Sequence, residues 1–190
     1  MSTFRFAIMG AGNIAHQFCD AVTLVEDCEV SAIASKDLGR AQKFAEECSV
    51  AHAYDNYEQM LIEEKPDCVY IAVTPNDHFR LTMLCLEHHV PVLCEKAMFT
   101  NSAEAKAVFE KAEKDQTFVM EAMWSRFLPA VNQAKKWAAE GKIGRLEALQ
   151  GRIGFLAPEG ADNRYHSPLL CGGAATDITV YAYEIATWLV

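Results

Sequence analysis

The sequence has no apolar run approaching the ~20 residues that a membrane helix needs, and its start has no charged segment followed by an apolar one. Positive charge is also scarce, because 17 lysines and arginines stand against 26 aspartates and glutamates. This balance argues against a broad nucleic-acid or anionic-membrane surface and leaves room only for a local positive pocket. We therefore predict no nucleic-acid partner, no membrane partner and a cytoplasmic location.

Paired cysteines and clustered metal ligands are missing as well. The seven cysteines are odd in number, include no Cys-x-x-Cys pair and mostly lie inside apolar runs, such as the run that begins at Cys68. We interpret them as reduced core thiols. The six histidines show no metal-ligand spacing, so we expect no metal site.

Short apolar runs alternate with helical stretches through the first two-thirds of the chain, a pattern typical of βαβ units and a parallel sheet. Helices are clearest over 37–48, where Asp37 offers an N-terminal carboxylate, and over 102–114, where Ser102 is the expected N-cap. The pattern predicts an α/β fold, a Rossmann-type doubly wound parallel sheet, over residues 1–122. Its expected strands are 5–9, 30–35, 51–54, 68–74, 92–95 and 118–122.

After Ala122 the pattern changes, and we expect the truncated start of an α+β substrate domain over 123–190. It contains a strand-like run over 145–156 and a final amphipathic helix from about 173 to 189. A lone strand needs partners, and Val190 follows with no capping glycine or polar tail. We therefore expect either further sequence beyond Val190 or a second copy of the chain, in a homodimer.

A glycine-rich segment follows the first expected strand and opens a helix. Gly10 suits a tight turn, Gly12 lets a pyrophosphate approach the backbone, and Ala15 lets helix and strand pack closely. Asn13 and Ile14 lie between them at the helix N-terminus, whose N–H groups favour phosphates. The segment predicts a dinucleotide-binding loop, with an ordinary turn as the alternative.

The second expected strand ends at Ser35 and Lys36, where a site for NAD would usually place an acidic residue for the adenosine ribose. A hydroxyl followed by a cation suits the 2′-phosphate of NADP, and Arg40 could add a second positive group. Asp37 beside Lys36 keeps NAD possible. The segment therefore favours NADP as cofactor without excluding NAD.

Two polar segments follow later strands, and ligands of open α/β sheets bind outside the carboxyl ends of the strands. Each segment also has an ordinary structural explanation, a turn with a helix cap for the first and a surface ion pair for the second. The candidate cofactor residues are Thr74, Pro75, Asn76 and His78 in the first segment and Glu95 and Lys96 in the second.

The ordered motifs GAGNIA, TPNDH, CEKAM, EAMWSRFLP and GGAATDITVYAYE resemble those of the Gfo/Idh/MocA oxidoreductase family. The resemblance covers the whole chain and is nearest to the branch of dimeric dihydrodiol dehydrogenases and glucose-fructose oxidoreductase. It implies an NAD(P)-dependent dehydrogenase. It also implies truncation, because members of the family continue into a large antiparallel sheet.

The resemblance also implies site residues. The family's Glu-Lys-Pro motif falls on Glu95, Lys96 and Ala97, so Lys96 takes the position of the active-site lysine, and Ala97 departs from the family's proline. The family's Asp-x-x-x-Tyr pair falls on Asp177 and Tyr181, which an i, i+4 spacing places on one helical face. An Asp177 that caps a turn and a Tyr181 that packs in the core are the alternatives.

The implied reaction is hydride transfer between the nicotinamide C4 and a carbinol carbon of a sugar, polyol or trans-dihydrodiol. Tyr181 would handle the proton on the substrate oxygen, Lys96 would favour its phenolate, and Asp177 would orient substrate or Tyr181. A nonenzymatic dinucleotide-binding or redox-sensing fragment is the second hypothesis. Glu121 and Arg126 flank the domain junction, where they either shape the site or form an ion pair.

Overall fold

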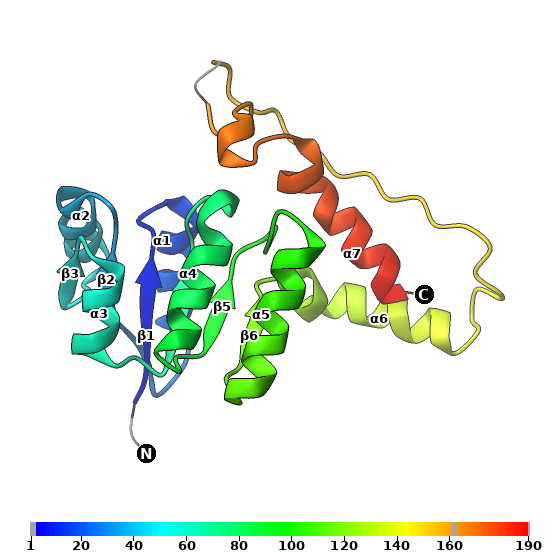
Figure 1. Ribbon diagram of the computed structural model, residues 1–190. Coiled ribbons are helices and arrows are strands. Elements are labelled where there is room, and N and C mark those ends of the chain that lie inside the picture. The colour runs from blue at the N-terminus through cyan, green and yellow to red at the C-terminus, as the bar shows by residue number, and fades with distance from the viewer. Residues whose placement is uncertain (1–2, 161–162, 190) are drawn as a thin grey trace. The chain divides into compact units, whose positions relative to one another are not determined.

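The computed structural model describes residues 3–160 and 163–189 and divides the chain into two compact units, Met1–Glu121 and Ala122–Val190 (Figure 1). In the first unit, strands and helices alternate along the chain. The strands are β1 (Phe4–Met9), β2 (Cys28–Ala34), β3 (His52–Tyr54), β4 (Cys68–Ile71), β5 (Val92–Cys94) and β6 (Val119–Glu121). The helices are α1 (Asn13–Val22), α2 (Leu38–Cys48), α3 (Tyr57–Glu64), α4 (Pro75–Glu87) and α5 (Ser102–Asp115).

The six strands form one parallel sheet in the order β3-β2-β1-β4-β5-β6. The order reverses between β1 and β4, which in a doubly wound sheet is the switch point where ligands bind. Helices α3, α4 and α5 lie in front of the sheet in Figure 1, and α1 packs beside α2. The predicted Rossmann-type fold is confirmed, and each predicted strand overlaps an observed one.

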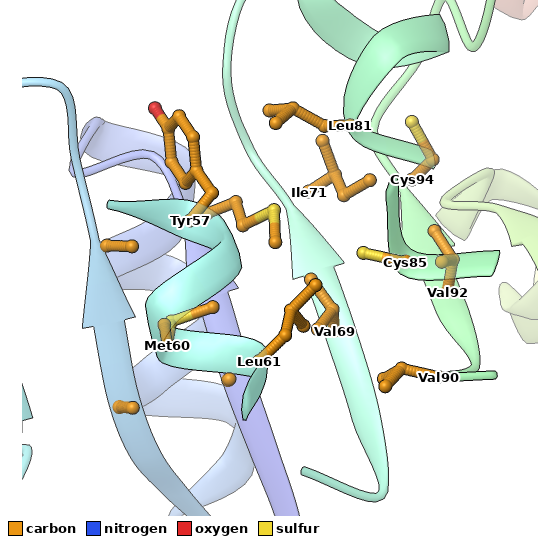
Figure 2. Close-up of a cluster of buried hydrophobic side chains, with 14 of the residues drawn as sticks. Tyr57, Met60, Leu61, Val69, Ile71, Leu81, Cys85, Val90, Val92 and Cys94 are labelled. Atoms are coloured by element: carbon orange, nitrogen blue, oxygen red, sulfur yellow. The ribbon is translucent and has the colours of Figure 1, made fainter. Parts of the chain in front are cut away.

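One cluster of this unit's core lies between the sheet and helices α3 and α4. All four residues of β4 are buried, and Figure 2 shows side chains of α3 and α4 around Val69 and Ile71. Strands buried on both faces need continuous apolar runs, which is why these segments stand out in the sequence. The labelled members of the cluster are Tyr57, Met60, Leu61, Val69, Ile71, Leu81, Cys85, Val90, Val92 and Cys94.

Helix starts in the first unit follow the capping rules, with one correction. Asp37 precedes α2 and accepts a hydrogen bond from the Arg40 backbone N–H at 2.8 Å, as predicted. The predicted N-cap of α5 is wrong by one residue, because Asn101 is extended and accepts from the Glu104 backbone N–H at 3.0 Å. Ser102 is already helical. An amide oxygen one residue earlier therefore displaces the hydroxyl from the capping role.

The regular elements in the described part of the second unit are all helical. Its elements are η1 (Trp124–Phe127), α6 (Pro129–Ala139), η2 (Pro168–Leu170), the π turn η3 (Ala175–Thr179) and α7 (Val180–Leu189). Helices α6 and α7 pack against each other, and η3 with α7 confirms the predicted final helix. Across residues 3–160 and 163–189, no helix is both long and apolar enough to span a membrane.

The strand predicted over 145–156 is wrong. The segment is exposed irregular chain, with Leu156 97% and Phe155 50% exposed. A strand needs a neighbour to accept its backbone hydrogen bonds, and no described segment of this unit is itself a strand. The alternating residues are present, but the pairing that would order them is not. That a second copy supplies it stays a prediction.

Candidate functional site

The glycine-rich loop between β1 and α1 has the geometry that a dinucleotide needs. Gly10 has φ +110°, and a Cβ at this position would lie 2.7 Å from the Ala72 carbonyl oxygen, so only glycine fits. A Cβ on Gly12 would meet nothing nearer than that same oxygen at 4.0 Å, which leaves open space beside the backbone. Ala15 is fully buried.

The N-terminus of α1 fits a pyrophosphate. Gly12 is the N-cap, makes no side-chain capping bond, and no acidic residue lies in the first turn. Asn13 and Ile14 are exposed there. Backbone N–H groups that no described side chain caps, at the positive end of a helix dipole, are suited to phosphate oxygens. The residues of this loop therefore fit the cofactor that the sequence predicts.

Two cations face one carboxylate near the end of β2, and a third reaches the glycine-rich loop. Lys36 Nζ forms an ion pair with Asp77 Oδ2, and Arg80 Nε lies 3.5 Å from Asp77 Oδ1. Arg40 Nη2 donates to the Ala11 carbonyl oxygen at 3.3 Å, which brings its guanidinium to the loop. Burial opposes ionisation of Asp77, but Lys36 and Arg80 outweigh it and hold the pKa of this carboxyl below its usual range.

Ser35 is buried and turned inward. Only 6% of it is exposed, and its hydroxyl oxygen accepts from the Asp37 backbone N–H at 3.4 Å. Its neighbour Lys36 is the exposed member of the pair, with 66% of its side chain accessible. Lys36 therefore offers more contact to a ligand than Ser35 does.

The segment after β4 begins α4. Thr74 is the N-cap, Pro75 is the first helical residue, and Asn76 is exposed beside them. The fixed φ of proline suits this first position, where a missing N–H costs nothing. The turn therefore presents the Asn76 amide at the carboxyl edge of the sheet.

His78 is fully buried and joins two loops. Its Nε2 lies 3.0 Å from the Val73 carbonyl oxygen, and its Nδ1 lies 3.0 Å from that of Ala97 and 3.2 Å from that of Met98. Burial lowers the pKa of the ring. A ring with no exposed surface influences a cofactor only through the two loops that it connects.

The segment after β5 holds Lys96 at the same edge of the sheet. The Glu95 backbone N–H donates to the Ile71 carbonyl oxygen at 2.9 Å, which ties the end of β5 to the end of β4. The Glu95 carboxylate accepts from Tyr70 Oη at 2.6 Å and from the Lys96 backbone N–H at 3.2 Å. Burial raises the pKa of Glu95. The Lys96–Ala97 peptide bond is cis.

Further along, Glu121 at the end of β6 accepts from the Met98 backbone N–H at 2.9 Å. The loop that carries Lys96 is therefore bonded to β4, to β6 and to the His78 ring. Lys96 itself is partly exposed. The first unit thus brings the glycine-rich loop, Lys36, Arg40, Asn76 and Lys96 to one edge of one sheet.

Asp177 and Tyr181 both have polar partners within the second unit. Arg164 Nη1 donates to Asp177 Oδ1 at 3.2 Å, and the Asp177 side chain is 14% exposed. Trp124 Nε1 donates to Tyr181 Oη at 2.9 Å, with the two rings edge to face at 5.9 Å. Asp177 lies in the π turn and Tyr181 is the second residue of α7.

Arg126 has its hydrogen-bond partner within the second unit. Its Nε bonds Glu184 Oε1, and Ser125 Oγ donates to Glu184 Oε2 at 2.8 Å, so η1 is fastened to α7. This pairing gives Arg126 a structural partner that the sequence analysis did not include. Trp124, which η1 carries, is held by the same attachment.

Three residues that the structure brings to these sites were not predicted from the sequence. They are Asp77, which pairs with Lys36 across 41 residues; Tyr70, which bonds Glu95 across 25; and Glu184, which pairs with Arg126 across 58. No local spacing indicates such partners. The position of Asp77 in the first turn of α4 was the one available signal.

Comparison with known proteins places the chain in a family. The model of an oxidoreductase family with an NAD-binding Rossmann fold matches residues 4–123, and that of the GFO/IDH/MocA C-terminal domain matches residues 131–190. The trans-1,2-dihydrobenzene-1,2-diol dehydrogenase of Mus musculus is 32% identical over 97% of this chain and 56% of its own length. The chain spans about half the length of the curated relatives it matches.

Solved structures agree on the fold. An NAD-binding protein from Listeria innocua superimposes with a TM-score of 0.88 at 22% identity, over 100% of this chain and 55% of that one. The 3-ketoreductase KijD10 of Actinomadura kijaniata, solved in complex with NADP and TDP-benzene, gives a TM-score of 0.69 at 26% identity, over 74% and 43%. The chain therefore belongs to the Gfo/Idh/MocA family of oxidoreductases.

Proposed function

We propose that this chain is the cofactor-binding and catalytic part of an NAD(P)-dependent dehydrogenase that acts on a carbinol carbon of a sugar, polyol or trans-dihydrodiol. The observation that carries the proposal is the open backbone at Gly12, at an uncapped helix N-terminus on the same sheet edge as Lys96. The name of the mouse relative, a trans-dihydrodiol dehydrogenase, supports the diol among the three substrate classes.

Each residue has a proposed part in the reaction. The bound cofactor supplies or accepts the hydride at its nicotinamide ring. Lys96 donates a hydrogen bond to the substrate oxygen and supplies the positive charge that favours a phenolate. Tyr181 holds the proton of that oxygen, and Trp124 directs its own N–H at the phenol oxygen. Asp177, held by Arg164, orients the substrate hydroxyls.

NADP is the proposed cofactor. Lys36 and Arg40 stand where a 2′-phosphate would be recognised, and β2 ends in no acidic residue. KijD10, at 26% identity, was solved with NADP. His78 acts in this proposal by fixing the two loops that follow β4 and β5.

A reducing, cytoplasmic compartment is proposed as well. All seven cysteines are free thiols, and burial raises the pKa of Cys68 to about 12. Buried thiols of this kind are typical of proteins kept under reducing conditions.

The test of the proposed function combines binding with turnover. NADPH fluorescence should report cofactor binding, and absorbance at the nicotinamide band should report oxidation of one member of a sugar and trans-dihydrodiol panel. Tyr181→Phe should reduce turnover by about 100-fold, as expected for loss of an acid–base group, with the Kd for NADPH unchanged. The matched control is Tyr183→Phe, two residues away and 73% exposed, which should leave turnover unchanged.

Two results would contradict the proposal in different ways. Cofactor binding without turnover on any panel member would favour the nonenzymatic dinucleotide-binding fragment. Absence of any binding would refute the cofactor site itself.

A further inference from the structure

Lys36, the cation proposed to recognise a 2′-phosphate, is already bonded to an acid from another element. Its ammonium pairs with Asp77 Oδ2, and the other oxygen of the same carboxylate faces Arg80 at 3.5 Å. Lys36 follows β2, whereas Asp77 lies in the first turn of α4, after β4. Since β1 lies between β2 and β4 in the sheet, the pair crosses the end of the strand that leads into the glycine-rich loop.

The Asp77 carboxylate is held as a fixed anion. Its side chain is 17% exposed, two cations face it, and the N-terminus of a 13-residue helix adds a favourable dipole. Lys36 and Arg80 keep its pKa below the usual range despite its burial. At neutral pH the group therefore carries a full negative charge at a defined place.

The Asp77 carboxylate lies beside Lys36, the position that bears on the choice between NAD and NADP. A dinucleotide fold that takes NAD usually has an acidic residue after β2, which accepts hydrogen bonds from the adenosine ribose hydroxyls. This chain has Ser35 and Lys36 there instead. The acid that follows them, Asp37, caps α2 through the Arg40 backbone N–H. Asp77 brings a carboxylate to the Lys36 ammonium from α4, so an acid reaches this place from a different element.

A carboxylate at this position interacts favourably with NAD and unfavourably with NADP. It can accept hydrogen bonds from the neutral hydroxyls of NAD, but it repels a 2′-phosphate and competes with that phosphate for the Lys36 charge. Arg40 is bonded to the backbone of the glycine-rich loop, so its charge is not opposed in the same way.

We propose that Asp77 is a specificity-determining residue of the cofactor site, which narrows the selectivity for NADP over NAD by engaging Lys36 and by presenting its own carboxylate to the adenosine ribose. The inference rests on the proposed function, because it assumes that a dinucleotide binds at this edge of the sheet. A residue that only stabilised the loop would change the affinities for both cofactors by the same factor. A specificity-determining residue changes their ratio.

The experiment measures the Kd values of NADPH and NADH by fluorescence titration of the full chain and of Asp77→Asn. The variant removes the charge and keeps the shape, and it should widen the ratio of Kd(NADH) to Kd(NADPH) about fivefold, the size of one partly exposed charge interaction. Asp77→Ser, which also suits a helix first turn, should widen it in the same direction and serves if Asp77→Asn fails to fold.

The matched control is Asp115→Asn. Asp115 also pairs with a lysine, Lys111 at 2.7 Å, but at the end of α5, on the opposite edge of the sheet. Asp115→Asn should leave the ratio of Kd(NADH) to Kd(NADPH) unchanged. A ratio that stays constant in the folded Asp77 variants, or that shifts equally in Asp115→Asn, overturns the inference while leaving the proposed function intact. A wild-type chain that binds neither cofactor overturns the proposed function instead.

Discussion

At the scale of single residues, the two glycines of the β1–α1 loop are required for different reasons. Gly10 is constrained by the protein, since its positive φ and the Ala72 carbonyl oxygen at 2.7 Å exclude a side chain. Gly12 has φ −106° and space around its Cβ position, so the folded chain itself would accept alanine there. In the proposed function, the requirement for glycine at position 12 comes from the dinucleotide that approaches this backbone.

This difference gives a paired prediction. Gly10→Ala should destabilise the chain by about 2 kcal/mol or more, because a strained φ and a backbone clash add together. Gly12→Ala should leave the melting temperature within about 2 °C of wild type, a change in unfolding free energy of under about 1 kcal/mol. It should nevertheless raise the Kd for NADPH at least tenfold, because the added methyl group fills the space through which the pyrophosphate approaches the backbone. Thermal unfolding and NADPH titration of both variants make the comparison. A Gly12→Ala chain that binds NADPH normally would contradict a phosphate at this backbone.

At the scale of elements, the start of α5 provides a direct test of helix capping. Asn101 accepts from the Glu104 backbone N–H, and the Glu104 carboxylate in turn accepts from the Thr100 backbone N–H at 2.9 Å. Asn101→Ala should therefore cost about 1 kcal/mol of unfolding free energy. Ser102→Ala, inside the first turn, should cost less than about 0.5 kcal/mol, as most substitutions away from such features do. Urea denaturation decides between the two, and equal costs would show that capping is shared.

The elements were predictable from sequence where local chemistry decides them. Apolar runs located the strands of the parallel sheet, and Asp37 marked the start of α2. The misplaced cap of α5 was a local error between two adjacent residues, whereas the wrong strand failed because its deciding interaction is not local. Residues 145–156 alternate as a strand does, but a strand forms only with a partner, and the described part of the second unit provides none.

The candidate site shows the same division. The glycine-rich loop could be predicted because its proposed role follows from a short motif at the end of a strand. The proposed role of Lys96 came from the family resemblance and not from its spacing. The pairing of Lys36 with Asp77 could not be predicted, because it depends on which strands become neighbours in the sheet. The bond between Trp124 and Tyr181 spans 57 residues and depends on how η1 packs against α7.

At the scale of the whole molecule, the two units differ in how much core each contains. The first holds a complete six-stranded sheet and nearly all of the buried apolar residues, whereas α6 of the second buries none of its own. The glycine-rich loop, Lys36, Arg40, Asp77 and Lys96 all belong to the first unit. Cofactor binding is therefore a property that the first unit should retain by itself.

We predict that residues 1–123 fold cooperatively and bind NADPH with a Kd within about twofold of the full chain, since a domain with its own core folds alone. Residues 124–190 expressed separately should show no cooperative transition in urea, because they bury too few apolar side chains. A shorter chain that unfolds without cooperativity, or that loses NADPH affinity tenfold, would show that the second unit is needed for the first.

The first turn of α4 has a consequence for communication between sites. Its adjacent residues Asp77 and His78 bond in two directions, the carboxylate to Lys36 after β2 and the ring to the Ala97 carbonyl oxygen after β5. For the ligands proposed to bind beside Lys36 and beside Lys96, this turn is a bonded route for any transfer of free energy between the two sites. Thermodynamic linkage makes that transfer reciprocal: the factor by which a group bound at Lys36 alters binding beside Lys96 equals the factor by which a ligand beside Lys96 alters binding at Lys36.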